Sequence, residues 1–311
     1  MTPPEISVVI PCYNERENAA NIAQAVIDQL EPICQSFDIL FIDNASTDNT
    51  VAIIKELCAK DDRIRLIANT RNFGQMRSPT HMVYTARGDA VIGICADFQD
   101  PPEMIPAFVE RWRAGADIVL GVRKSEVAGF VTTVFRRVSY WFAQRFGDYP
   151  LVPNATGFGL YDQKVVRQIA AMNEPEPFFR GMLVETGYRI ETLVYERPVR
   201  ARGISSNTFF VLLDFALSSL ASFSKKIIRV PFFIGVGVCG LAGLAMLGAL
   251  IALLTGAAVL PWLIAAGVEL QFGILFIFLG IMGDQVRLIS ERTRGTPLVF
   301  ERERVNFPED Y

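Results

Sequence analysis

The sequence predicts an α/β protein whose mostly parallel sheet is flanked by helices, and three observations support this fold class. Short apolar runs alternate with helical stretches as far as residue 122, which is typical of βα units in a parallel sheet. Polar residues follow the ends of several apolar runs. Charged residues are spread evenly up to Arg229 and are then nearly absent until Asp284, so an α/β domain is followed by an apolar part.

The predicted elements of the α/β domain follow one another along the chain. Short apolar runs bounded by polar or turn residues predict strands at 6–10, 37–42, 64–67, 90–95 and 118–122. The stretches between them predict helices at 18–30, 47–60, 75–86 and 103–113. Parallel sheets bind ligands at the carboxyl ends of their strands, so the residues that follow these strands are the candidate site.

Composition restricts the kinds of partner and metal. The 311 residues carry a formal net charge of −3, which gives no reason to expect a nucleic-acid partner. The five cysteines form no CxxC pair, and His81 is the one histidine of the sequence. These features argue against a structural zinc site and favour reduced thiols in a cytosolic domain.

Two apolar runs, at 231–254 and 262–282, are each long enough to cross a hydrocarbon core about 30 Å thick. The alternative is a buried core helix. Basic residues flank the outer ends of the pair, whereas the connecting loop has no Lys or Arg. The positive-inside rule then predicts a multi-pass protein of the inner (plasma) membrane, with the α/β domain and both termini in the cytosol.

The resulting domain prediction has four parts. A cytosolic α/β domain occupies 1–205 and a juxtamembrane amphipathic helix occupies 206–229, although a helix packed on the domain is the alternative for the second part. The transmembrane hairpin occupies 230–289 and a cytosolic tail 290–311. Glu269, within the second run, marks a functional intramembrane carboxylate, a helix end or a contact with a partner subunit.

The residues after the first and second strands suit a nucleoside. Tyr13 offers a ring face, Glu15 can accept ribose hydroxyls, and Asp43 can accept base N–H groups. For a lone Asp after a strand the alternative is a helix cap. No GxGxxG or GxxxxGK[ST] motif is present, so neither a dinucleotide fingerprint nor a P-loop is supported.

Four motifs resemble the inverting family-two glycosyltransferases of GT-A fold: VIPCYNE (9–15), DNASTDNT (43–50), NFGQ (72–75) and ADFQDPPE (96–103). The similarity is greatest to the polyprenyl-phosphate sugar transferases, which include dolichyl-phosphate mannose synthase and the bactoprenol glucosyltransferases. It implies a membrane enzyme that moves a sugar from a nucleotide-diphosphate sugar to a polyprenyl phosphate on the cytosolic face, with inversion. Membrane lipid and a possible homo-oligomeric partner are implied as well.

The resemblance also implies roles for individual residues. Asp97 and Gln99 would hold Mg²⁺ or Mn²⁺, and Asp97 and Arg123 would be catalytic. Nucleotide binding would fall to Pro11, Tyr13, Glu15, Asp43, Cys95 and Ala96. The acceptor phosphate would contact Arg136, Arg137 and Ser139, for which a solvated helix face near anionic lipid is the alternative.

The sequence departs from the family pattern at several positions. Cys95 stands where relatives carry the first Asp of the metal motif, and a neutral thiol is a poor ligand for a hard cation. Gly157 and Gly159 stand where relatives carry Asp and Arg, and Ser206 replaces a Lys. These changes leave two alternatives open: a glycosyltransferase acting on another lipid such as diacylglycerol, or a degenerate non-catalytic membrane scaffold.

Overall fold

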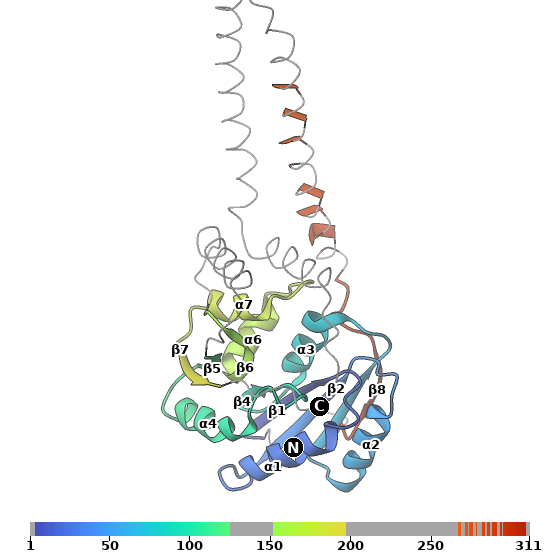
Figure 1. Ribbon diagram of the computed structural model, residues 1–311, viewed down its shortest axis with the longest axis vertical. Coiled ribbons are helices and arrows are strands. Elements are labelled where there is room, and N and C mark those ends of the chain that lie inside the picture. Colours follow the sequence, from blue (N-terminus) through green and yellow to red (C-terminus); the bar gives the residue numbers. More distant parts are fainter. Residues whose placement is uncertain are drawn as a thin grey trace, which may run out of the picture.

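One eight-stranded sheet organises the computed structural model (Figure 1). The structure describes residues 4–124, 152–196 and 295–308, together with scattered residues between 267 and 293. The strands stand in the order β7-β5-β6-β4-β1-β2-β3-β8. Their bounds are β1 Ile6–Cys12, β2 Phe37–Asp43, β3 Ile64–Asn69, β4 Ala90–Gly93, β5 Ile118–Arg123, β6 Ala155–Asp162, β7 Ile190–Tyr195 and β8 Glu301–Val305.

Parallel pairing dominates the centre of the sheet and antiparallel pairing enters on both sides. β1 pairs in parallel with β2 and β4, β2 with β3, and β5 with β7. β6 runs antiparallel between β4 and β5, and β8 runs antiparallel beside β3. Every residue of β2 is buried, which explains its continuous apolar run. The predicted α/β class with a mostly parallel sheet and flanking helices is therefore confirmed.

Helices cover both faces of the sheet (Figure 1). One face packs α1, α2 and α4 into a core with side chains such as Ile22, Ile54 and Phe108. The other packs α3, α6 and α7, with Met82, Val165 and Leu183 in its core. The bounds are α1 Ala19–Leu30, α2 Thr50–Lys60, α3 Gly74–Thr85, the short 3₁₀ helix η1 Pro102–Met104, α4 Ile105–Arg113, α6 Gln163–Ala171 and α7 Phe179–Glu185.

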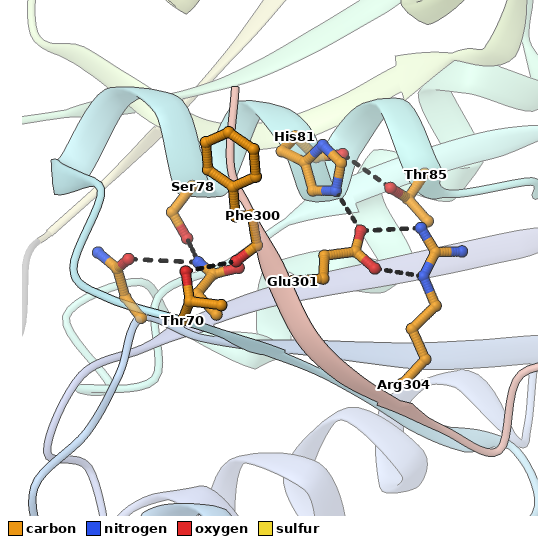
Figure 2. Close-up of polar contacts among 9 residues, drawn as sticks. Thr70, Ser78, His81, Thr85, Phe300, Glu301 and Arg304 are labelled. Carbon is orange, nitrogen blue, oxygen red and sulfur yellow. Dashed lines mark hydrogen bonds and ion pairs between the residues drawn. The ribbon is translucent and has the colours of Figure 1, made fainter. Parts of the chain in front are cut away.

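The C-terminal strand β8 lies within 290–311, the segment that the sequence predicts to be a tail. Its anchoring to α3 and β3 is shown in Figure 2. Oε1 of Glu301 lies 2.6 Å from Nε2 of His81 and accepts a hydrogen bond from Nη2 of Arg304 at 2.8 Å. The carbonyl of Phe300 accepts the amide of Thr70 at 2.9 Å. Residues more than 200 positions apart in the chain thus share one sheet edge.

The localisation predicted from the sequence, a multi-pass inner-membrane protein with cytosolic termini, requires correction. In the parts that the structure describes, no helix combines the length and apolarity needed to cross a membrane. Helices α1 and α3 have 12 residues each, about 18 Å at the usual rise, against a hydrocarbon core of about 30 Å.

The predicted C-terminal parts lie mostly outside the described residues. This holds for the helix at 206–229 and the run at 231–254, whereas the run at 262–282 is described at scattered positions. The four domain bounds therefore stay predictions.

Candidate active site

The loops after β1 and β2 are joined at the carboxyl edge of the sheet. Cys12 and Asp43 are register partners at the ends of the two strands. Beyond them, the amide of Asn14 donates to Oγ of Ser46, and Oδ1 of Asn14 accepts the amide of Thr47, both at 2.8 Å. Asn14 adopts a positive φ of 57°, which Asn tolerates better than most residues. The two polar loops therefore form one surface.

Asp43 is fully buried and its two carboxylate oxygens have different surroundings. Oδ2 accepts the amide of Ser46 at 2.9 Å, whereas Oδ1 is buried with no hydrogen-bond partner. Burial raises the pKa of Asp43, and the hydrogen bonds from Ser46 oppose the rise. The side chain does not cap α2, whose N-cap is Asn49, so the helix-cap alternative is not what the structure shows. Oδ1 is therefore a buried acceptor whose hydrogen-bonding capacity is unused among the described residues.

The other residues predicted to bind a nucleoside lie on the β1 side of this surface. Pro11 is half-buried in β1, and Tyr13 exposes 42% of its surface. Oε2 of Glu15 accepts Nδ2 of Asn18 at 2.7 Å, and the Glu15 amide donates to Oγ1 of Thr50. Tyr13 therefore presents a ring face to solvent, while one carboxylate oxygen of Glu15 is committed to helix α1.

The loop after β4 carries the residues predicted at the metal. Oδ1 of Asp97 accepts the amide of Gln99 at 3.2 Å, and both side chains are half-buried. Ala96 is buried, so contact with a nucleotide would involve its backbone. Cys95 is partly open to solvent, but the packing around its thiol, with Asp100 and Asp97 nearby, raises its pKa well above the usual value. The thiol is therefore protonated at neutral pH.

Asp100 belongs to this loop and is not among the site residues that the sequence predicts. It is buried, and Oδ1 accepts the hydroxyl of Tyr195 at 2.9 Å while Oδ2 accepts the amide of Cys95 at 3.3 Å. The Tyr195 hydroxyl also accepts Nε of Arg123 at 3.3 Å. The motif ADFQDPPE contains Asp100, but nothing in the sequence reveals a partner 95 residues away.

Burial and these hydrogen bonds together set the pKa values of Asp100 and Tyr195 beside the end of β5. Burial raises the pKa of Asp100, although the hydrogen bond from Tyr195, the one from Cys95 and the charge of Arg123 oppose the rise. Burial and the charge of Asp100 raise the pKa of Tyr195 to about 12. The phenol is therefore a donor at neutral pH. Arg136, Arg137 and Ser139, predicted at the acceptor, lie outside the described residues.

The chain matches the model of glycosyl transferase family 2 over residues 7–170. It belongs to glycosyl transferase family 2. It is 30% identical to a glycosyltransferase of Synechocystis sp., with 94% of this chain and 93% of the relative covered. It is 29% identical to the bactoprenol glucosyl transferase of Shigella phage SfX, with 96% and 99% covered.

Among solved structures, the chain is similar to the mannosyltransferase PcManGT of Pyrobaculum calidifontis in complex with GDP-Man and Mn²⁺. It is 17% identical, covers 95% of this chain and 88% of its own, and has a TM-score of 0.46. The protein is thus a glycosyltransferase, by its family and its relatives of similar length.

The two glycines that depart from the family pattern differ in what their surroundings allow. Gly157 has a φ of +101° and open space where a Cβ would stand. At Gly159 a Cβ would lie 2.3 Å from the carbonyl oxygen of Val119. Gly159 sits in β6 between Gly93 of β4 and Leu120 of β5, and the two atoms nearest to a Cβ there belong to the backbone of β5. In this glycosyltransferase, therefore, no side chain fits at 159 without a shift of the sheet.

Two oxygen donors in the loop after β4 fit a divalent cation. Mg²⁺ commonly takes one or two carboxylates together with substrate phosphates and water, and Asp97 with Gln99 can supply the protein's share. Asp100 is buried and accepts a hydrogen bond at each oxygen, and the protonated Cys95 thiol is a poor donor. Within the described ranges no group of three His, Cys, Asp or Glu suits a metal ion.

Proposed function

We propose that this glycosyltransferase moves a sugar from a nucleotide-diphosphate sugar to a polyprenyl phosphate, with inversion at the anomeric carbon. The main support is one sheet edge that carries a buried, unpartnered acceptor at Asp43, an accessible carboxylate at Asp97 and a cation at Arg123. In that order, these groups could accept a hydrogen bond from the base, bind the metal on the diphosphate, and neutralise the negative charge of the leaving diphosphate.

The nucleoside would bind across the loops after β1 and β2. The Tyr13 ring would stack on the base, and Oδ1 of Asp43 would accept a base N–H. Glu15 and the backbone around Pro11, Cys95 and Ala96 would line the ribose and the phosphates.

The diphosphate would lie between the loop after β4 and the end of β5. Asp97 and Gln99 would hold Mg²⁺ or Mn²⁺, which when bound would neutralise charge on the leaving diphosphate. Arg123 has Nε engaged by Tyr195, while neither terminal nitrogen has a partner among the described residues. A guanidinium held in this way can bind two phosphate oxygens at once.

The acceptor would supply its own nucleophile. A phosphate monoester has a second pKa of about 6 and is anionic at neutral pH. One of its oxygens would attack the anomeric carbon on the side opposite the diphosphate; the bond from that carbon to the diphosphate oxygen would break, and the configuration would invert. A hydroxyl acceptor would need a general base, for which Gly157 offers no side chain. Arg136, Arg137 and Ser139 are proposed to hold the acceptor phosphate.

The choice of acceptor has separate support from the similarity to the bactoprenol glucosyl transferase of phage SfX, which extends over nearly the whole of both chains. The test is to incubate the purified full chain and Mn²⁺ with undecaprenyl phosphate and a panel of UDP- and GDP-sugars, and to detect the lipid-linked sugar by mass spectrometry. We expect transfer from at least one donor. Diacylglycerol is the control acceptor; transfer to its hydroxyl and not to the phosphate would refute the proposal.

A further inference from the structure

Tyr195 lies between the two segments that are proposed to bind the diphosphate, the loop after β4 and the end of β5. Arg123 and Tyr195 are register partners at the ends of the parallel strands β5 and β7, so their side chains leave the sheet on the same face. Asp100 belongs to the loop that carries Asp97 and Gln99. The Tyr195 hydroxyl donates a hydrogen bond to Asp100 and accepts one from Arg123, and so connects the loop after β4 to the end of β5.

The ring of Tyr195 is fixed independently of its hydroxyl. It is 6% exposed and packs edge-on against Phe158, with 5.4 Å between ring centroids. Phe158 packs in turn against Phe108 at 4.8 Å. At Gly121 a Cβ would lie 2.6 Å from the Phe158 ring and 3.1 Å from the Tyr195 ring, so the glycine makes room for both. Apolar packing therefore holds the ring, and the two hydrogen bonds add to the placement of its hydroxyl.

We infer that Tyr195 is a positioning residue for sugar transfer, which fixes the guanidinium of Arg123 relative to the loop that carries Asp97; this role rests on the function proposed above. The single phenolic proton goes to Asp100, because an ionised carboxylate only accepts and a guanidinium only donates. The bond to Nε leaves the two terminal nitrogens of Arg123 for phosphate oxygens. Misplacement of a catalytic cation by about 1 Å can cost on the order of 100-fold in rate.

The test is a double-mutant cycle between Tyr195→Phe and Arg123→Lys. Tyr195→Phe removes the hydroxyl and keeps the ring packing, and we expect kcat to fall by about tenfold or more. In the Arg123→Lys background, which lacks Nε, the same change should lower kcat less than about threefold. Tyr84→Phe is the matched control, because its hydroxyl contacts the carbonyl of Ile169 at 3.4 Å, away from the site. An equal loss in both backgrounds would mean that Tyr195 does not act through Arg123 and would overturn the inference.

A second pair of variants keeps the inference testable if Tyr195→Phe folds poorly. Asp100→Asn retains an oxygen for the Tyr195 hydroxyl and should keep more kcat than Asp100→Ala; equal losses would contradict the positioning role. The kcat of each variant is compared with that of the wild type on the same acceptor, whichever acceptor the wild type uses. Absence of transfer to undecaprenyl phosphate by the wild type would refute the proposed acceptor. The double-mutant cycle can still be measured on another reaction of the enzyme, such as hydrolysis of the donor. Additive effects of the two mutations on that reaction would refute the role of Tyr195.

Discussion

The two ends of the candidate active site are assembled by different kinds of strand pairing. The end proposed to bind the nucleoside, called the nucleoside end, comprises Tyr13, Glu15 and Asp43 and follows β1 and β2, which are consecutive in the chain and adjacent in the sheet. The end proposed to bind the diphosphate, called the diphosphate end, comprises Asp97, Gln99 and Arg123 from the ends of β4 and β5, which β6 separates in the sheet. The first end depends on local βα units, and the second on contacts such as Arg123 to Tyr195, 72 residues apart.

This difference predicts that the two ends control different steps. A local, preformed nucleoside surface should govern how tightly the donor binds. The diphosphate end should govern transfer, since charge develops there as the bond to the sugar breaks.

The largest expected effect is at Asp97, the accessible carboxylate of the diphosphate end. Asp97→Asn should lower kcat at least about 100-fold, because it removes a charged ligand of the cation that is proposed to neutralise the leaving diphosphate. The measurement is transfer at saturating Mn²⁺, with Asp62→Asn, an exposed acid elsewhere, as the control. Near wild-type turnover in Asp97→Asn would remove Asp97 from the metal assignment.

A smaller but substantial effect on stability is expected at Gly159, where β6 approaches the backbone of β5. Gly159→Ala should lower the free energy of unfolding by about 3 kcal/mol, because backbone atoms must shift to admit the methyl group. Gly157→Ala, at a positive φ in open space, should cost about 1 kcal/mol. Thermal unfolding of the two variants compares them directly, and equal shifts in Tm would contradict the packing at Gly159.

The anchoring of β8 should depend on pH. Burial alone would raise the pKa of Glu301, but hydrogen bonds and charges from Arg304 and His81 prevail and lower it from 4.5 to about 2. A carboxyl with a depressed pKa in the folded state stabilises the fold fully above its unfolded pKa, and this contribution is lost as pH falls from about 4.5 toward 2.

Glu301→Gln should therefore lower the free energy of unfolding by about 2 kcal/mol at pH 7, and progressively less as pH approaches 2. Glu17→Gln, on an exposed part of the loop before α1, is the control and should show little effect at any pH. Denaturant unfolding at several pH values gives the comparison. A pH-independent difference for Glu301→Gln would show that the carboxylate's charge does not anchor β8.

The smallest effect is expected at Cys95, in the loop after β4 that is proposed to bind the metal. Cys95→Asp adds an oxygen donor two residues before Asp97 and should lower the half-saturating Mn²⁺ concentration by about threefold to tenfold. The new carboxylate also approaches Asp100, whose Oδ2 accepts the Cys95 amide, so the metal-free variant should melt at a lower temperature. Cys95→Ser is the neutral control. Unchanged metal dependence would place residue 95 outside the coordination sphere.

Much of the nucleoside end was predictable from sequence because its signals are local. Apolar runs gave β1 and β2 within two residues of their observed ends, and the polar residues after them fall on one sheet edge. The partner of each Asp43 oxygen, however, depends on the turn through Ser46, which a strand-end pattern does not specify.

The diphosphate end and β8 were less predictable because their partners are remote in sequence. Asp100 was visible only as part of a motif, and the register between β5 and β7 that brings Tyr195 to Arg123 leaves no periodic signal. The alternating charges of β8 are typical of an exposed tail. Its pairing with β3 and its contact with His81 join residues that are remote in sequence, so the sequence pattern does not indicate them. The clash at Gly159 was equally invisible, because it arises from the antiparallel insertion of β6.

The most direct test of the division between the two ends is a set of binding titrations with uridine, guanosine, UDP and GDP in the presence of Mn²⁺. The variants are Asp43→Asn and Arg123→Gln, compared with the wild type by isothermal calorimetry. Asp43→Asn should weaken the preferred nucleoside and its diphosphate by the same factor, about tenfold or more. Arg123→Gln should weaken the diphosphate alone. Unchanged nucleoside binding in Asp43→Asn, or weakened nucleoside binding in Arg123→Gln, would contradict the account.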